Sequence, residues 1–154
     1  MMAMMLTLHV FAALIWVGGM FFAYMVLRPA AAGLLQPPER LGLWVGVFSR
    51  FFPWVFASIA LLLASGYWMV LSFYGGFEHV GLHVHIMIWS GYLMMLIFMH
   101  VFFAPFRRLK QAVAAGDWQA GAKSLAQIRV LIAANLLLGV AIVAVASGGR
   151  YLLN

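Results

Sequence analysis

The chain contains no cysteine, and only three of its 154 residues are acidic. The missing cysteine excludes a disulfide framework, a thiolate zinc site and a copper relay built on cysteine. Charged residues of both signs make up 8% of the chain, whereas 67% of it is hydrophobic. A soluble globular domain carries about 25% charged residues, so that class is excluded and a membrane protein is indicated. The sequence also shows no nucleotide-binding motif and no hydrolytic triad.

Four long apolar runs stand where the charge is missing, and each is long enough for a helix that crosses a bilayer. They predict an all-α fold, namely a polytopic membrane protein whose four-transmembrane-helix bundle forms one domain over residues 1–154. The spans are expected at about 4–27, 53–74, 84–104 and 128–147. Proline and glycine mark the expected limits of these spans: Arg28-Pro29, Pro53, Gly75-Gly76, Pro105 and Gly148-Gly149.

Two polar connections separate these spans. The first is expected to hold a short interfacial helix after Pro37-Pro38. The second should continue the third span as a helix, break at Gly116-Asp117 and lead into the fourth span, with Asp117 as the N-cap.

The nine basic residues are distributed unevenly between the two sides of these spans. Eight of them lie in the two polar connections or at their edges, and only Arg150 lies on the other side. Basic residues favour the cytoplasmic side, so both termini are expected to face outward, in an N-out/C-out topology. We therefore predict a multi-pass protein of the bacterial inner (plasma) membrane. Orientation also explains the net charge of +6 better than nucleic-acid binding does.

This topology gathers four of the five histidines at the outer, periplasmic face. His79 and His83 lie in the outer loop, within the segment "HVGLHVHIM", and His85 begins the third span. His9 lies in the first span near the same face. His100 lies near the cytoplasmic end of the third span. An ionisable group inside a membrane helix indicates a functional site by default.

A haem b held by His9 and His85 is the first interpretation of this cluster. The two residues come from different helices at matching depth, and neutral imidazole suits iron. His83 and His85 point about 200° apart on a helix, so only one faces the interior, and His85 is preferred with His83 next. His100 lies roughly 22 Å from His85 along the helix, so it would serve a second haem or an inner site. Arg150 is the candidate partner of a haem propionate.

Copper is the alternative for the same outer cluster, with His9, His79, His83 and His85 as candidate ligands. Thioether sulfur suits Cu(I), and a group of methionines precedes His9: Met1, Met2, Met4 and Met5. Methionine is also an ordinary filler of apolar helices, so the group does not decide between the two metals.

Two stretches resemble a known family. The segment "LHVFAALIWVGGMFF" (8–22) is similar to the first helix of the CopD-like (copper resistance D) family, whose pattern is a His followed by Trp-x-Gly-Gly. The segment "FSRFFPWVFASIALLLASGYW" (48–68) resembles the second helix of that family, which begins with Phe-Ser-Arg and ends with Ser/Thr-Gly. The chain departs from the family pattern at His83 or His85, where a Lys is usual, and at Asn135, where an acid is usual.

The resemblance implies a four-helix inner-membrane protein associated with copper uptake. A more distant likeness to the HemJ-like protoporphyrinogen oxidases implies haem b as cofactor and a porphyrin as substrate. The first interpretation is thus a b-type cytochrome on a CopD-like frame, a membrane oxidoreductase that transfers electrons between quinone and a periplasmic redox partner. Copper binding or transport is the alternative, followed by HemJ-like oxidation and a purely structural subunit. Membrane lipid is the expected surrounding. A homodimer is a further candidate assembly, because four short helices enclose little volume.

Overall fold

The computed structural model describes residues 1–152, with side chains up to residue 149. Its elements are helices throughout, and no strand occurs within the described residues, which confirms the all-α class. The elements are α1 (Met2–Phe21), the π-helical segment η1 (Phe22–Leu27), α2 (Arg28–Leu34), α3 (Pro37–Ser72), the 3₁₀ turn η2 (Phe77–His79), α4 (Leu82–Phe103), α5 (Pro105–Ala114) and α6 (Trp118–Leu152).

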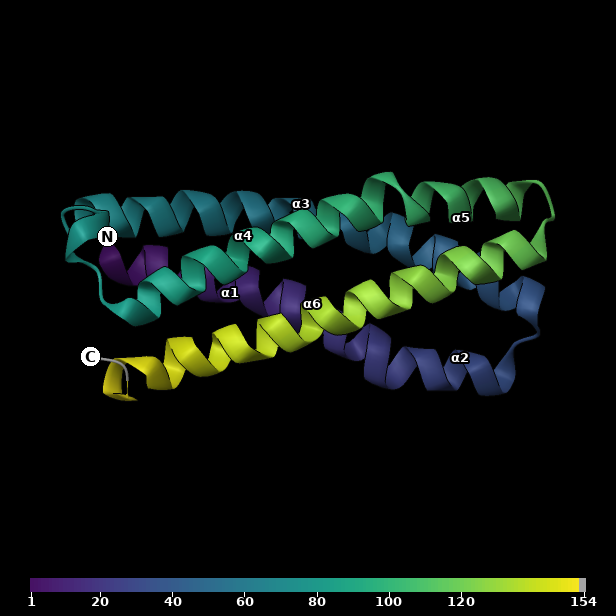
Figure 1. Ribbon diagram of the computed structural model, residues 1–154, viewed down its shortest axis with the longest axis horizontal. Helices are drawn as coiled ribbons and strands as arrows, with labels where there is room; N and C mark the ends of the chain where they lie inside the picture. The colour runs from purple at the N-terminus through teal and green to yellow at the C-terminus, as the bar shows by residue number, and fades with distance from the viewer. Residues whose placement is uncertain (153–154) are drawn as a thin grey trace.

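These elements join into four rods that are long and apolar enough to cross a membrane: Met2–Leu34, Pro37–Ser72, Leu82–Ala114 and Trp118–Gly149. In Figure 1 the start of α1 and the last turns of α6 lie at the same end, together with the turn between α3 and α4. We call this the histidine end, because it carries His9, His79, His83 and His85. The opposite end, at the turns 35–36 and 115–117, is called the arginine end, because a cavity there is lined by Arg28, Arg40 and Arg129.

The first rod continues through the Arg28-Pro29 pair, so the expectation that this pair ends the helix is wrong. Proline removes a backbone N–H and crowds the preceding turn. Six residues of π-helix, Phe22–Leu27, precede this pair, and Pro29 lies in the first turn of α2. A π segment widens the helix locally and changes its hydrogen-bond register. The rod therefore reaches Leu34 before it ends.

The second rod is one continuous helix of 36 residues, so the separate interfacial helix expected after Pro37-Pro38 is not formed. It begins at a capping box, in which the Glu39 carboxylate accepts a hydrogen bond from the backbone N–H of Gln36 at 3.2 Å. Pro53, expected to begin this helix, lies inside it. At about 1.5 Å per residue, α3 is on the order of 54 Å long, well beyond the roughly 30 Å of a hydrocarbon core.

The remaining helix limits follow the expectations in part. Asp117 caps α6, because its Oδ1 accepts the backbone N–H of Ala120 at 3.0 Å, as predicted. The third rod bends at Pro105 and continues as α5, which confirms the expected helical extension. At the other end, α6 runs through Gly148-Gly149 to Leu152, so that pair does not end the helix.

The core consists of two helix pairs joined by aromatic rings. α1 packs mainly against α3, and α4 and α5 pack against α6. Between the pairs, Phe52 of α3 meets Phe98 of α4 at 5.3 Å and Phe106 of α5 at 4.8 Å between ring centroids, both edge to face. Such ring pairs are favourable over a range of relative positions. Many large apolar side chains on the outer surface are exposed, so they contact lipid in a membrane.

Candidate functional site

His9 lies on α1 where this helix packs against α3, and its ring reaches α3. Its Nδ1 atom is 2.8 Å from the Oγ atom of Ser65. The Ser65 hydroxyl donates its own proton to the carbonyl oxygen of Leu61 at 2.5 Å, so Oγ can only accept from His9. The Nδ1 atom then carries the ring proton, and the neutral imidazole keeps its lone pair on Nε2. A histidine whose other N–H is held in this way is oriented for metal binding.

Gly66 provides the space that this imidazole occupies. A Cβ atom at position 66 would lie 3.3 Å from Cε1 and 3.7 Å from Nδ1 of His9. The first distance is tighter than an ordinary van der Waals contact, so a side chain here would press on the ring. Ser65 therefore orients the ring of His9 through a hydrogen bond, and Gly66 leaves the space that the ring occupies.

The residues of the first similar segment continue this contact along α1. At Gly19 any side chain would collide with the ring of Phe51 on α3. Trp16 is 3% exposed and packs edge to face against Phe98 of α4, with ring centroids 6.2 Å apart. His9, Trp16 and Gly19 therefore all lie at contacts between helices. The two segments singled out in the sequence meet each other where His9 contacts Ser65-Gly66.

Met5 lies on the same face of α1 as His9, one turn nearer the N-terminus. Residues four apart on a helix are neighbours on its surface, and both side chains are half-buried. Met1 and Met4 are different, since their side chains are 81% and 54% exposed. Of the N-terminal methionines, burial therefore distinguishes Met5, and also the half-buried Met2, from the two that face outward.

The other histidines are spread over the histidine end and beyond. His79 closes the short turn η2 and is exposed, whereas His83 and His85 lie in the first turn of α4 and are both half-buried. The Nδ1 atom of His83 is buried and has no hydrogen-bond partner among the described residues. His100 lies near the far end of α4 with its side chain exposed.

These side chains do not form a preassembled metal cluster in the part of the chain that the structure describes. No group of three or more His, Asp or Glu residues there is placed to bind one ion. His9 belongs to the α1–α3 pair, whereas His83 and His85 belong to the pair formed by α4 and α6. The side chain of Arg150, the candidate partner of a propionate, lies outside the described residues.

A tyrosine pair joins the two helix pairs near the histidine end. The hydroxyl groups of Tyr67 on α3 and Tyr92 on α4 share a hydrogen bond. Tyr67 follows Ser65-Gly66 directly, so this link lies close to His9. No sequence pattern indicates this pair, because two tyrosines 25 positions apart come together only when the helices pack.

Asn135 is the buried polar group in the middle of the bundle. Its side chain is 3% exposed, and its Nδ2 donates to the backbone carbonyl of Met94 at 3.3 Å. Its Oδ1 is buried without a partner among the described residues, which is unusual because a buried polar atom costs free energy when unpaired. One turn on, Gly139 lets α6 approach Val17 and Met94 closely.

Sequence reasoning found His9 but missed Ser65 as its partner. The signal was present, because the Ser-Gly pair at the end of the second similar segment is an unusual polar interruption in an apolar run. What it could not supply is the register between α1 and α3, which places residue 65 opposite residue 9. The cavity at the arginine end was also missed, since its arginines were counted only for orientation.

One comparison with known proteins gives a match. Residues 45–148 match the family model of copper resistance protein D, CopD. The matched part includes Ser65-Gly66, His83, His85, His100 and Asn135, and it begins after α1. The comparisons with curated proteins and with solved structures each give no match. Because the family match covers more than half of the 154 residues, the chain belongs to the CopD family of membrane proteins.

Proposed function

We propose that this protein binds Cu(I) at the histidine end, as a membrane protein of copper resistance. The observation that carries the proposal is the state of His9, whose Nδ1 is held by Ser65 at 2.8 Å and whose Nε2 is thereby left as the metal-binding atom. Membership of the CopD family supports copper as the cargo. The proposal replaces haem, which was the first interpretation of the sequence, by copper.

Met5 supplies the second ligand. Cu(I) is a soft ion that accepts thioether sulfur and imidazole nitrogen, and Met5 and His9 offer one of each on the same face of α1. Both are half-buried, so an ion between them exchanges its water for fixed ligands. A small ion needs only the ends of these two side chains, so the proposal does not require the other histidines to move.

A route further into the bundle follows from the buried methionines. Met20 and Met94 are 4% and 3% exposed, so their sulfur atoms lie in the core rather than in lipid. The unpartnered Oδ1 of Asn135 lies on the residue that bonds to the Met94 carbonyl. These groups offer further soft and oxygen ligands below His9, and we include them in the proposal as the path of a transported ion.

The experiment that tests this proposal is anaerobic Cu(I) competition against a chromophoric chelator, with the protein purified in detergent. The wild type is expected to bind copper, whereas His9→Ala and Met5→Leu should each weaken binding by about tenfold or more, since a first ligand is lost. Met4→Leu is the matched control, because Met4 lies beside Met5 in sequence but is exposed. Equal affinity in Met4→Leu and Met5→Leu, or undiminished binding in His9→Ala, would contradict the proposal.

Haem b is the second candidate, and one observation favours it. The fixed proton on Nδ1 of His9 leaves Nε2 able to bind iron as well as copper, and His85 on the other helix pair is the candidate second ligand. His9 and His85 would hold the iron, and the group would supply electron transfer with quinone or a periplasmic redox protein. The absorption spectrum of purified protein separates the two: a Soret band would favour haem, and copper without a Soret band would favour the first proposal.

A further inference from the structure

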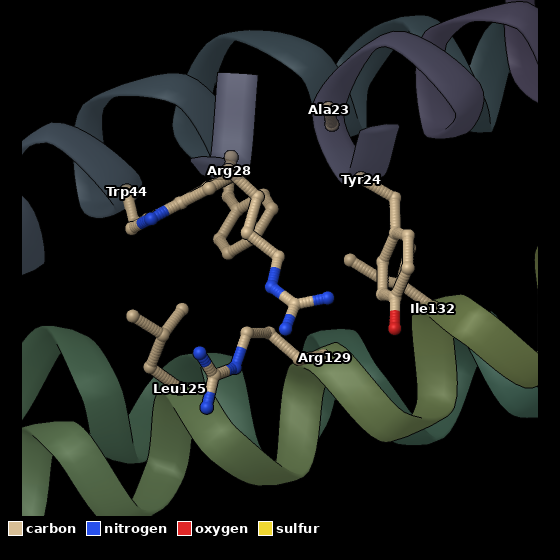
Figure 2. Close-up of a pocket in the computed structure, with 8 residues that line it drawn as sticks. Ala23, Tyr24, Arg28, Trp44, Leu125, Arg129 and Ile132 are labelled. Atoms are coloured by element: carbon tan, nitrogen blue, oxygen red, sulfur yellow. The ribbon is translucent and has the colours of Figure 1, made fainter. Parts of the chain in front are cut away.

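The arginine end contains an open cavity of about 510 Å³ between the first, second and fourth rods. Arg28 from the start of α2, Arg40 from the first turns of α3 and Arg129 from α6 all line it. Figure 2 shows a small adjoining pocket that shares part of this lining, with the side chains of Arg28 and Arg129 between Tyr24 and Leu125. The volume of the open cavity is within the range of about 300–1,000 Å³ that small-molecule sites occupy.

Few carboxylates are available in the chain to neutralise these three guanidinium groups. The chain has only three acidic side chains. Glu39 accepts the backbone N–H of Gln36, and Asp117 caps α6 at Ala120. The third, Glu78, lies in η2 at the opposite end of the bundle.

Like charges that face one cavity repel one another, and the cost rises as water is excluded. Part of the charge of Arg28 is met by the ring of Tyr24, with Cζ 4.8 Å from the ring centroid. A cation–π contact holds the guanidinium in place but leaves its N–H donors free to bond elsewhere. The cavity is thus lined by guanidinium donors, one of which is held in place by an aromatic ring.

We infer that this cavity binds a phosphate group, carried by an anionic membrane lipid or free in solution. Guanidinium groups bind phosphate oxygens through paired, charge-assisted hydrogen bonds. The rest of the lining suits the lipid source, since Met25 and Ala32 are exposed apolar residues beside the arginines and Trp44 adds an aromatic wall. Basic pockets between membrane helices on the cytoplasmic side are known sites for anionic headgroups.

The test uses full-length protein that has been stripped of lipid in detergent, with thermal unfolding as the readout. Phosphatidylglycerol, zwitterionic phosphatidylcholine and inorganic phosphate are titrated separately at constant ionic strength. We expect phosphatidylglycerol to raise the unfolding temperature in a saturable way, and phosphatidylcholine to do so much less. A saturable response to inorganic phosphate as well would assign the site to free phosphate in addition. No response to either anion would overturn the inference.

Matched variants separate the cavity from the general positive charge of this end. Arg28→Gln with Arg129→Gln removes two cavity arginines, and the apparent dissociation constant for phosphatidylglycerol should rise by about tenfold or more, since bonds to charged groups are lost. Arg107→Gln with Lys123→Gln removes the same charge from exposed positions on α5 and α6 and should change it less than about twofold. Equal losses in both double variants would overturn the inference.

A charge-preserving variant guards against a misfolded double variant. Arg129→Lys keeps the positive charge but loses the planar fork that bonds two oxygens at once. It should fold and still bind phosphatidylglycerol more weakly than the wild type. If Arg129→Lys binds phosphatidylglycerol as tightly as the wild type does, paired hydrogen bonds from Arg129 to the phosphate are not used. That result would contradict the proposed geometry.

Discussion

At the scale of single residues, the two nitrogens of the His9 ring have different tasks. Nδ1 is fixed by Ser65, whose hydroxyl is in turn fixed by the Leu61 carbonyl. This chain of bonds selects one tautomer and one ring orientation without using any charged group. A neutral hydrogen-bond pair costs far less inside a membrane than an ionised one, which explains why a protein with three acidic residues orients its histidine with serine.

Replacing Ser65 by alanine should weaken Cu(I) binding by about 10- to 100-fold, the range seen when a group behind a metal ligand is removed. The cost in stability should be small, about 0.6 kcal/mol for one interhelical hydrogen bond in a membrane. Ser147→Ala is the control, because Ser147 also donates to the carbonyl four residues earlier, at 2.9 Å from Val143. Chelator competition and thermal unfolding measure both effects, and equal copper affinity in the two variants would contradict the assigned role.

Replacing Gly66 by alanine should disturb the same site by a steric route. The new Cβ would lie 3.3 Å from Cε1 of His9, so the ring must shift and lose its alignment with Ser65. Gly91→Ala is the matched control, because nothing lies within 4 Å of its Cβ and alanine in a helix interior gains about 0.5–1 kcal/mol over glycine. Copper affinity should fall in Gly66→Ala only, and a fall in both variants would assign the effect to the helix rather than to the ring.

The sequence was sufficient to single out His9, because an ionisable residue in an apolar helix is rare and costly. It was not sufficient to decide which neighbours it has. His9, His79, His83 and His85 are predicted to share one membrane face, and the structure places them at the histidine end, on a turn and on two helix pairs. Nearness in sequence or at one face of the membrane does not fix the distance between two side chains, because helix rotation and tilt set that distance.

At the scale of the elements, the helices run through positions where proline and glycine were expected to end them. Those expectations come from helices in water, where a lost hydrogen bond is replaced by solvent. Inside a membrane no water is present to form a hydrogen bond with an unpaired backbone group, so the helix continues and its backbone adjusts locally. The π segment Phe22–Leu27 before Pro29 is such an adjustment. The breaks predicted correctly lie near Gly75-Gly76, Pro105 and Asp117.

Replacing Pro53 by alanine should therefore stabilise α3. The side chain is exposed, so little packing is lost, and the N–H restored at position 53 can bond within the helix. An interior proline costs up to ~3 kcal/mol, and we expect a gain of about 1 kcal/mol or more, since the bundle already compensates in part. Pro38→Ala, in the first turn of α3, should change stability little because no N–H is needed there. Thermal unfolding of both variants measures the difference, and a destabilised Pro53→Ala would show that this proline is needed in the helix.

At the scale of the whole molecule, the fold class was predictable and the orientation rests on charge. Long apolar runs leave few alternatives to a helical bundle, and the four rods confirm it. Both ends of the chain's helical path lie at the histidine end (Figure 1), which agrees with an even number of crossings. Which side of the membrane that end faces is a prediction from the eight basic residues that lie in the half of the bundle toward the arginine end.

Reporter fusions test this orientation. A fusion after residue 154 should report a periplasmic location, and one inserted in the turn 115–117 should report a cytoplasmic location, because basic residues are retained on the cytoplasmic side. Alkaline phosphatase and green fluorescent protein give opposite readouts and serve as controls for each other. The reverse pattern would place the histidine end in the cytoplasm and the proposed copper site on that side.

The excess length of the rods has a consequence for what meets the arginine end. The rods of 32 to 36 residues are longer than a hydrocarbon core requires, so parts of them lie outside the acyl chains. With about 54 Å of α3 against a core of roughly 30 Å, on the order of 24 Å of this helix lies outside the hydrocarbon, counted over both of its ends. Electrostatic screening acts over about 8 Å at physiological ionic strength. Since the two headgroup layers add only roughly 10–15 Å to the core, α3 extends past them by about one such screening length in total, and a soluble molecule can meet its end there.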